Sequence, residues 1–301
     1  MENQTAGPML AVQQIQLGSR LNTEEQARET LAAVRRAGFD GIELNGFMTQ
    51  PTGLVVQLLT RAAGMPTGRG GKLNWPKLIG ESGLCVPALH LDLGTIGRDA
   101  TAAALRAKKF GADTIVITAM YRFPYQEEAQ VRELAGRLNR AGKALKARGV
   151  RLLYHNHNIE FLRYPDGKMP YDILMEETDP EFVNFEFDSY WAADAGADTL
   201  AVMRRLGGRL RLWHINDRGA VIKKTPMTPI VKMDSTELGR GCLNLTDMWT
   251  AAMKAGVDAV ILESHRNWID GDPVKSAAVS CAWMKRQKAG QMAAQLQEGA
   301  D

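Results

Sequence analysis

Cysteine is scarce in this chain of 301 residues, which has only Cys85, Cys242 and Cys281, far apart in the sequence. Three dispersed cysteines form neither a disulfide framework nor a Cys-x-x-Cys metal site. Each is therefore expected to be a small buried hydrophobic residue. Such cysteine usage is typical of a reducing compartment, so we expect a cytoplasmic protein.

Long apolar runs and an excess of one charge are lacking as well. No stretch approaches the ~20 consecutive apolar residues that cross a bilayer, and the first residues lack the basic and apolar regions of a secretory signal. Lys and Arg number 37 against 34 Asp and Glu, a net charge of +3, which is too small to indicate a nucleic-acid partner. With 45% hydrophobic and 24% charged residues, the composition excludes disordered and collagen-like chains.

What the sequence does contain is a regular alternation of helix-like segments and short β-rich runs. Many of the helix-like segments are followed by Gly, the residue that most easily takes the left-handed conformation at a helix end. Strands are expected over residues 10–17, 39–44, 84–91, 113–118, 150–155, 182–188, 210–215 and 258–263. Helices are expected over residues 23–37, 100–110, 127–148, 245–255 and 273–287, and loops over 65–71 and 218–236.

This alternation predicts βαβ units and a parallel sheet. Eight units in about 300 residues are typical of an α/β fold of the (β/α)8 TIM-barrel type. We expect a single barrel over residues 8–290, with peripheral tails at 1–7 and 291–301. The alternative is a doubly wound open sheet, but the Gly-x-Gly-x-x-Gly that usually follows its first strand is absent.

Polar side chains stand at the ends of strands that should be apolar. His155, Asp188, His214 and Glu263 end four consecutive expected strands, the fifth to the eighth. In a TIM barrel the carboxyl ends of the strands form the active-site rim, so these side chains should converge. Two imidazoles and two carboxylates in one small volume need a neutralising partner. We therefore predict one divalent metal ion, for which nitrogen and oxygen ligands suit Mn, Mg, Co, Zn or Fe.

The fifth strand runs into a second histidine, in the sequence His155-Asn156-His157. Alternate residues of a strand point to the same side, so both imidazoles should face the same pocket. We favour His155 as the metal ligand and His157 as a catalytic residue that contacts substrate or moves a proton. The reverse assignment stays open.

Several longer segments resemble a known family. They are LLYHNHNIEF (152–161), DPEFVNFEFDSYWAADAGAD (179–198), LWHIND (212–217), ELGRGCLN (237–244) and VILES (260–264). With them the chain resembles the sugar phosphate isomerase/epimerase family of xylose isomerase-like TIM barrels, in the branch with YHNH on strand five. The resemblance implies one divalent metal, usually Mn or Mg, held by His155, Asp188, His214 and Glu263. The epimerase branch usually has Glu at the strand-five position, where this chain has His155.

The expected activity is that of a metal-dependent sugar isomerase or epimerase. Glu263 would remove the proton next to a carbonyl, and the cation would stabilise the resulting enediolate. Because the opposing Glu is missing, a one-base isomerisation is favoured, or an elimination or hydration. A lyase or hydratase acting on a 3-keto-glycoside or an inosose is therefore the main alternative. An endonuclease-like phosphodiesterase and a non-catalytic sugar-binding barrel are two further alternatives from other classes.

The expected partner is a small sugar or keto sugar rather than a nucleic acid or a membrane, and a homo-oligomer is also considered. Glu43 and His90 lie at earlier strand ends, where they would complete the sugar pocket. The full set expected to contact the sugar is Glu43, His90, Trp191, Asp217, Arg218 and Glu237.

Overall fold

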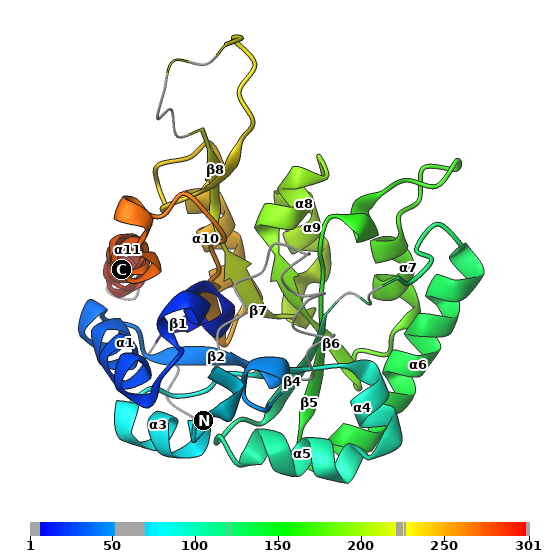
Figure 1. The fold of residues 1–301 in the computed structure, drawn as a ribbon. Coiled ribbons are helices and arrows are strands. Elements are labelled where there is room, and N and C mark those ends of the chain that lie inside the picture. Colours follow the sequence, from blue (N-terminus) through cyan, green and yellow to red (C-terminus); the bar gives the residue numbers. More distant parts are fainter. Residues whose placement is uncertain are drawn as a thin grey trace.

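The structure is a computed structural model that describes residues 7–51, 70–118, 120, 122–220, 225 and 227–298. Eight parallel strands close into a barrel in the order β1-β10-β7-β6-β5-β4-β3-β2, surrounded by helices (Figure 1). The predicted TIM barrel is therefore confirmed. The strands are β1 Met9–Gln13, β2 Gly41–Asn45, β3 Leu89–Leu91, β4 Thr114–Thr118, β5 Arg151–His155, β6 Val183–Asp188, β7 Leu210–Ile215 and β10 Ala259–Leu262.

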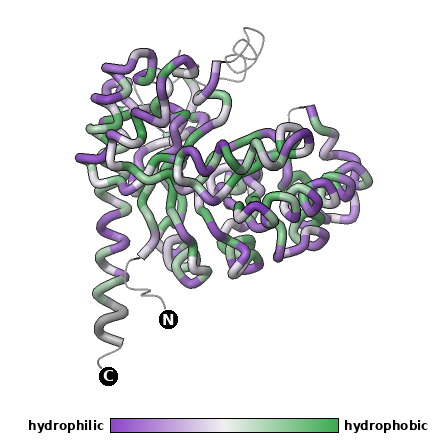
Figure 2. Tube along the Cα trace, turned by 90° about the horizontal axis from the view of Figure 1, so that it is seen from below, coloured by the Kyte–Doolittle hydropathy of each residue, from purple (hydrophilic) through white to green (hydrophobic). Residues whose placement is uncertain are grey.

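Helices cover the outside of the barrel, and the hydropathy pattern along the chain reflects their two-sided character (Figure 2). The helices are α1 Glu24–Ala37, α3 Trp75–Ser82, α4 Leu93–Arg98, α5 Ala100–Lys108, α6 Glu128–Lys146, α7 Pro170–Glu177, α8 Ser189–Asp194, α9 Thr199–Leu206, α10 Leu245–Ala255 and α11 Pro273–Glu298. Among the described residues, no helix combines the length and the apolar character needed to span a membrane.

Helix α1 shows how the local sequence sets these bounds. The Thr23 side chain accepts a hydrogen bond from the Gln26 N–H and caps the first turn, which satisfies one of the free N–H groups of a helix start. Gly38 ends the helix at φ 107°, in the left-handed region, where a side chain would be strained. Leu31 and Val34 lie on the face of the helix that packs against the barrel, and both are buried in the hydrophobic core.

The inside of the barrel has a small apolar core of its own, formed by Ala11, Ala88, Val116, Leu153, Leu212, Ala259 and Ile261. Strand residues two positions apart face the same side. Two residues after an inward apolar position, the sequence therefore places a polar side chain in the next layer toward the carboxyl ends: Gln13, His90, Thr118, His155, His214 and Glu263. The strand period thus builds a polar layer directly above an apolar one.

Several sequence-based bounds differ from the structure. The expected strand 10–17 ends at Gln13 and continues as a 3-10 helix, η1 Gln14–Arg20, which starts where the Gln13 side chain accepts the Ile15 N–H. The expected strand 84–91 is shortened to β3, with one isolated bridge at Cys85. Pro87 lies between them, and proline has no N–H to donate to a sheet.

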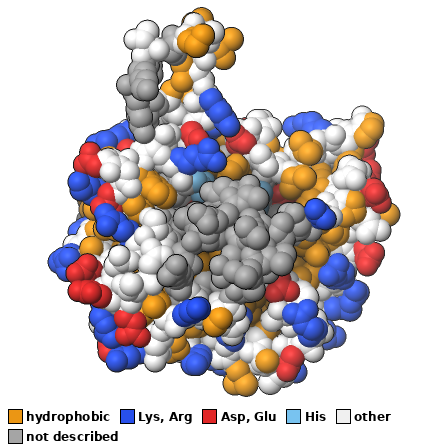
Figure 3. Space-filling model, viewed as in Figure 1, with side chains coloured by type: hydrophobic (Ala, Val, Ile, Leu, Met, Phe, Trp, Pro, Cys, Tyr) orange, Lys and Arg blue, Asp and Glu red, His pale blue; other side chains and the backbone are white. Residues whose placement is uncertain are grey.

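The expected loop 218–236 also holds regular structure, a two-stranded hairpin of β8 Asp217–Gly219 and β9 Asp234–Thr236. It forms the base of an arm that projects from the molecule with apolar side chains near its tip (Figures 1 and 3). Met227 and Ile230 on this arm are exposed. Residues 65–69 of the other expected loop lie outside the described residues.

Helix α11 continues beyond the expected end at residue 287 to Glu298, so residues 291–298 of the expected peripheral tail are helical (Figure 2). The expectation that all three cysteines are buried is wrong. Of the three cysteines only Cys281 is buried, whereas Cys85 and Cys242 are exposed. Small apolar size alone therefore does not bring these two residues into the core.

Candidate metal centre and active site

The four residues at the carboxyl ends of β5, β6, β7 and β10, the last four barrel strands along the chain, lie close together. His155, Asp188, His214 and Glu263 each offer one ligand atom, and these atoms lie within 4.8 Å of one another. Nδ1 of His214 is 2.9 Å from Oε2 of Glu263 and 4.0 Å from Oδ2 of Asp188. The ring centroids of His155 and His214 are 4.7 Å apart. The structure thus brings together the residues that the sequence analysis selected.

A second group of buried acids and imidazoles lies against this cluster. Oε2 of Glu43 is 2.7 Å from Nε2 of His214 and 3.0 Å from Nε2 of His90. Oε2 of Glu186 is 2.9 Å from Nδ1 of His155 and 3.1 Å from Nε2 of His90. We call Glu43, His90 and Glu186 the supporting layer. Carboxylates behind ligand histidines hold the rings in orientation and increase their basicity.

Glu186 was not selected from the sequence. It precedes Asp188 by two positions on β6, so the two side chains share a face of the strand. That spacing is the signal that could have found it. Glu43 is fully buried and contacts the rings of His90 and His214, and its expected contact with sugar stays a prediction.

The buried groups shift one another's pKa values strongly. Burial raises the pKa of Asp188 to about 8. Burial alone would lower the pKa of His90, but the carboxylates of Glu43 and Glu186 raise it to about 10. Burial would raise the pKa of Glu263, but the hydrogen bond with His214 holds it below its usual range. Without a cation, protons balance part of the negative charge.

This donor set fits a divalent metal ion. Two imidazoles and two carboxylates supply nitrogen and oxygen ligands, and a metal is bound by their deprotonated forms, so its binding would release protons from the cluster. In His155, Nδ1 is occupied by Glu186, which leaves Nε2 as the other ring nitrogen. His214 likewise holds Glu43 through Nε2 and presents Nδ1 to Glu263 and Asp188.

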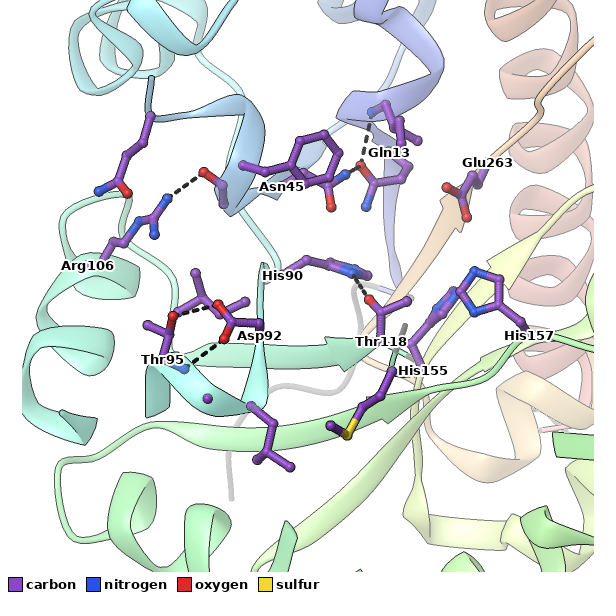
Figure 4. A pocket seen from close by; sticks show the side chains of 18 of the residues that line it. Gln13, Asn45, His90, Asp92, Thr95, Arg106, Thr118, His155, His157 and Glu263 are labelled. Carbon is purple, nitrogen blue, oxygen red and sulfur yellow. Dashed lines mark hydrogen bonds between the residues drawn. The ribbon is translucent and has the colours of Figure 1, made fainter. Parts of the chain in front are cut away.

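A cavity of about 820 Å³ opens above the cluster and is lined by His90, His155, His157 and Glu263 (Figure 4). A second cavity, of about 440 Å³, shares Ile15, His157 and Glu263 with the first. The two cavities therefore meet beside Glu263. Of the four carboxylates in the cluster and the supporting layer, Glu263 lines both cavities, and Glu43, Glu186 and Asp188 line neither.

His157 lies where the two cavities meet. Its Nδ1 atom is buried and has no hydrogen-bond partner among the described residues, and its backbone N–H donates to Glu160. Burial lowers the pKa of His157 to about 3, so the ring is neutral at physiological pH. An unpaired buried ring nitrogen costs free energy unless a ligand occupies it. In the smaller cavity Trp191 lies beside His157, with 5.8 Å between ring centroids, and Tyr190, His265 and Trp268 add further aromatic surface.

The other residues expected to contact sugar line neither cavity. Asp217 accepts hydrogen bonds from the N–H groups of Gly239, Gly241 and Leu243, and so it organises the chain beyond β9. A Cβ at Gly241 would lie 2.2 Å from Oδ1 of Asp217, which explains why glycine is needed there.

Two more of these residues are held by local contacts. Arg218 forms an ion pair of 2.8 Å with Asp194. Glu237 is buried and accepts the hydroxyl of Ser276 at 2.6 Å. Their expected role in sugar binding stays a prediction.

Comparison with known proteins places this geometry in a family. The chain matches the xylose isomerase-like TIM barrel model over residues 31–287. It is 36% identical to an inosose dehydratase of Mesomycoplasma hyopneumoniae strain 7448 over 97 residues, a match that spans only 31% of this chain and 30% of that protein. It is 23% identical to an inosose dehydratase of Bacillus velezensis over 81% of this chain and 83% of that one.

Solved structures agree on the fold. A crystal structure of a sugar phosphate isomerase/epimerase from Parabacteroides distasonis superposes with a TM-score of 0.72 at 21% identity, covering 96% of both chains. At this identity the likeness concerns the fold alone. Since the family model matches most of the chain, the protein belongs to the xylose isomerase-like TIM barrel family.

Proposed function

We propose that this protein is a divalent-metal-dependent enzyme that removes a proton next to a carbonyl of a sugar-like substrate and then expels a substituent from the neighbouring carbon. In this proposal His155, Asp188, His214 and Glu263 hold the metal, with Mn or Mg as the first choice. Glu263 is the base, and His157 contacts the substrate. The reaction class is thus that of a lyase or dehydratase.

One observation carries the choice of elimination. Among the four carboxylates of the site, Glu263 alone is partly exposed and lines the cavities, and strand five offers the imidazole of His155. Epimerisation at one carbon by two opposed carboxylates needs a second such group on the other face of the substrate. A single base that removes one proton is sufficient for elimination, once the leaving group can depart.

The relatives support this direction, because the matching proteins named above are inosose dehydratases. Isomerisation by the same base is the second candidate. Glu263 could return the proton to the adjacent carbon, and the unpaired Nδ1 of His157 beside it could bind the second oxygen of the substrate.

The chemistry that the residues perform follows from their environment. A bound divalent ion would withdraw electrons from a carbonyl and so acidify the neighbouring C–H bond. Glu263, whose pKa is held below its usual range, is ionised at neutral pH and can take the proton. His157, neutral and half-buried, can hydrogen-bond the departing hydroxyl, which leaves as water once it takes the proton held by Glu263. The supporting layer fixes the rings of His155 and His214.

The test is an NMR screen of keto sugars, inososes and 3-keto-glycosides in deuterated buffer, with Mn present or with EDTA. We expect wild-type protein to release an elimination product only when metal is present. Glu263→Gln should lower the rate by at least about 100-fold, as expected for loss of a general base. The exposed carboxylate of Glu133 on α6 provides the matched control, Glu133→Gln, which should keep the wild-type rate.

Three results would overturn the proposal: wild-type activity that survives EDTA, a Glu263→Gln variant with an unchanged rate, or a ketose product without elimination. The last result would replace the lyase by the isomerase. Solvent deuterium at the carbon next to the carbonyl reports proton removal separately from the later step.

A further inference from the structure

The larger cavity extends away from the metal centre to a basic end. Figure 4 shows Arg106, Asp92 and Thr95 at the side of the cavity opposite Glu263 and His157. Arg137 also lines this cavity. It belongs to α6, which contacts α4 and α5, the helices that carry Thr95 and Arg106. Arg106 thus lies at the end remote from the candidate base, and Arg137 lines the same cavity.

Arg106 is held in place by neutral acceptors. One of its terminal nitrogens, Nη2, donates to the carbonyl oxygen of Gly46 at 2.5 Å and to the hydroxyl of Thr49 at 3.1 Å. The side chain is half-buried, and this burial lowers its pKa. A partly desolvated guanidinium favours an anionic partner. The N–H groups on Nε and Nη1 of Arg106 form no hydrogen bond with the residues that the structure describes, so they can donate to one.

Arg137 forms no hydrogen bond or ion pair within the part of the chain that the structure describes. Its side chain is partly buried, whereas Arg140, one turn further along α6, is exposed. Many other arginines of the described chain, such as Arg132 and Arg151, contact carboxylates. An arginine that faces the reaction cavity without a carboxylate is therefore unusual in this molecule.

The charge at this end of the cavity is not balanced. Asp92 is the acidic residue that lines it, and its carboxylate caps α4 by accepting the N–H of Thr95 at 2.8 Å and the hydroxyl of Thr95 at 2.5 Å. The sequence has no Asp or Glu between Glu43 and Glu81, so the stretch that follows β2 cannot supply another carboxylate. The carboxylate of Asp92 acts on Arg106 and partly offsets its charge, so Arg137 is the cation of this cavity without a carboxylate partner among the described residues.

We propose that the substrate carries an anionic group, a carboxylate or a phosphate, which Arg106 and Arg137 bind at the end of the cavity away from Glu263. This inference rests on the proposed function, because it assumes that the carbonyl end of the substrate lies at the metal centre. Arginine is well suited to such oxygen anions, since its planar fork makes paired hydrogen bonds. A cavity of about 820 Å³ is in the range that holds a small organic ligand.

The experiment measures binding rather than turnover. Titration calorimetry on Mn-loaded protein compares glucose with two charged analogues, glucuronate and glucose 6-phosphate. We expect the charged sugars to bind at least about tenfold more tightly than glucose, as charge-assisted hydrogen bonds would give. Tighter binding of glucuronate identifies a carboxylate as the natural group, and tighter binding of glucose 6-phosphate identifies a phosphate. Equal binding of all three sugars would overturn the inference.

Variants separate a specific site from general charge. Arg137→Gln should remove most of the preference for charged sugars, whereas Arg140→Gln on the same helix should keep it. Arg106→Lys retains the charge but loses the fork, so an intermediate preference is expected, and it keeps a donor for Gly46. If Arg140→Gln weakens anion binding as much as Arg137→Gln, or if Arg137→Gln binds charged sugars like wild type, no anionic subsite exists here.

The failure of this inference is distinguishable from failure of the proposed function. Glu263→Gln should keep the preference for charged sugars, because the arginines act independently of the base. Protein that prefers charged sugars but exchanges no proton in any keto sugar would retain the subsite and lose the proposed reaction. Protein that performs the elimination while binding neutral and charged sugars equally would retain the reaction and lose the subsite.

Discussion

The candidate metal centre and the supporting layer below it have nearly the same composition but different access. Each combines carboxylates with imidazoles. The ligand atoms of the metal centre lie within 4.8 Å of one another, and so do those of the supporting layer taken together with His214. The two groups differ in their carboxylates: Glu263 of the metal centre lines both cavities, whereas Glu43 and Glu186 of the supporting layer line neither, and only the imidazole of His90 in that layer reaches the larger cavity. A mixture of acids and imidazoles therefore indicates only a polar barrel interior. Contact with a cavity identifies Glu263 as the carboxylate that can meet a substrate.

The largest expected effect comes from removing the charge of Asp188, a carboxylate of the candidate metal centre, while keeping its cap on α8. Asp188→Asn keeps an oxygen that can accept the Trp191 N–H and so preserve the cap of α8. We expect metal affinity to fall by at least about 100-fold, because the charge of a ligand is lost. Calorimetric titration with Mn measures this affinity.

A matched variant separates ligand loss from cap loss. Asp188→Ala should lose the metal equally and should also destabilise the metal-free protein by about 1 kcal/mol, the usual cost of a lost cap. Wild-type metal affinity in Asp188→Asn would show that the upper cluster is not the metal site.

A smaller effect is expected from the supporting layer. Glu186→Gln should weaken metal binding by roughly 10- to 100-fold, the usual effect of losing a carboxylate behind a ligand histidine. Elemental analysis of the loaded protein should give one metal per chain. Two metals per chain, with one lost in Glu186→Gln, would mean that the supporting layer and His214 form a metal site of their own.

The pH dependence of stability should reveal the neutral histidine at the cavity junction. The folded-state pKa of His157 is about 3, below the unfolded value of ~6.5. Between these values the unfolded state binds more protons, so the free energy of unfolding falls as the pH falls below about 6.5, by at most about 1.4 kcal/mol per pH unit.

Urea unfolding of metal-free protein at pH 7 and pH 5 measures this loss. His157→Gln should reduce the loss, since its side chain does not titrate. An equal loss in the variant and in wild type would show that His157 is not held neutral in the fold.

The smallest effect on the site is expected at Asp217. Asp217→Asn weakens acceptors for three backbone N–H groups, so we expect a loss of about 1–3 kcal/mol in the free energy of unfolding. Metal affinity should stay within twofold of wild type, because this side chain lies outside both cavities. Loss of metal binding without loss of stability would instead place Asp217 at the metal centre.

The barrel and the upper cluster could be predicted from sequence because both follow from a strand period. Apolar runs marked the strands, and a polar residue that ended such a run, such as His214 or Glu263, marked the rim. Glu186 was not predicted, because a carboxylate within β6 could equally point away from the barrel interior. Closure of the barrel decides which face is inside, and closure is not visible within one strand.

Arg106 and Arg137 were not predicted as site residues for a different reason. Arg106 and Arg137 lie on helices, where an arginine is usually solvated, and only the packing of α4, α5 and α6 brings both to the cavity. Asp217 and Glu237 were selected from motif segments, but their contacts organise the chain around β8, β9 and α11. The sequence could not show these contacts, because they depend on how β8, β9 and α11 pack, and the expected role of both residues in sugar binding stays a prediction.

Asp188 joins the candidate metal centre to one wall of the smaller cavity. Its Oδ1 holds the N–H of Trp191 at 2.9 Å, while Oδ2 points toward His214. A shift of this carboxylate would therefore also move the first turn of α8 and the indole of Trp191. The fluorescence of Trp191 would then report metal binding. Without a bound metal, this aromatic wall of the smaller cavity would be held less firmly for a substrate.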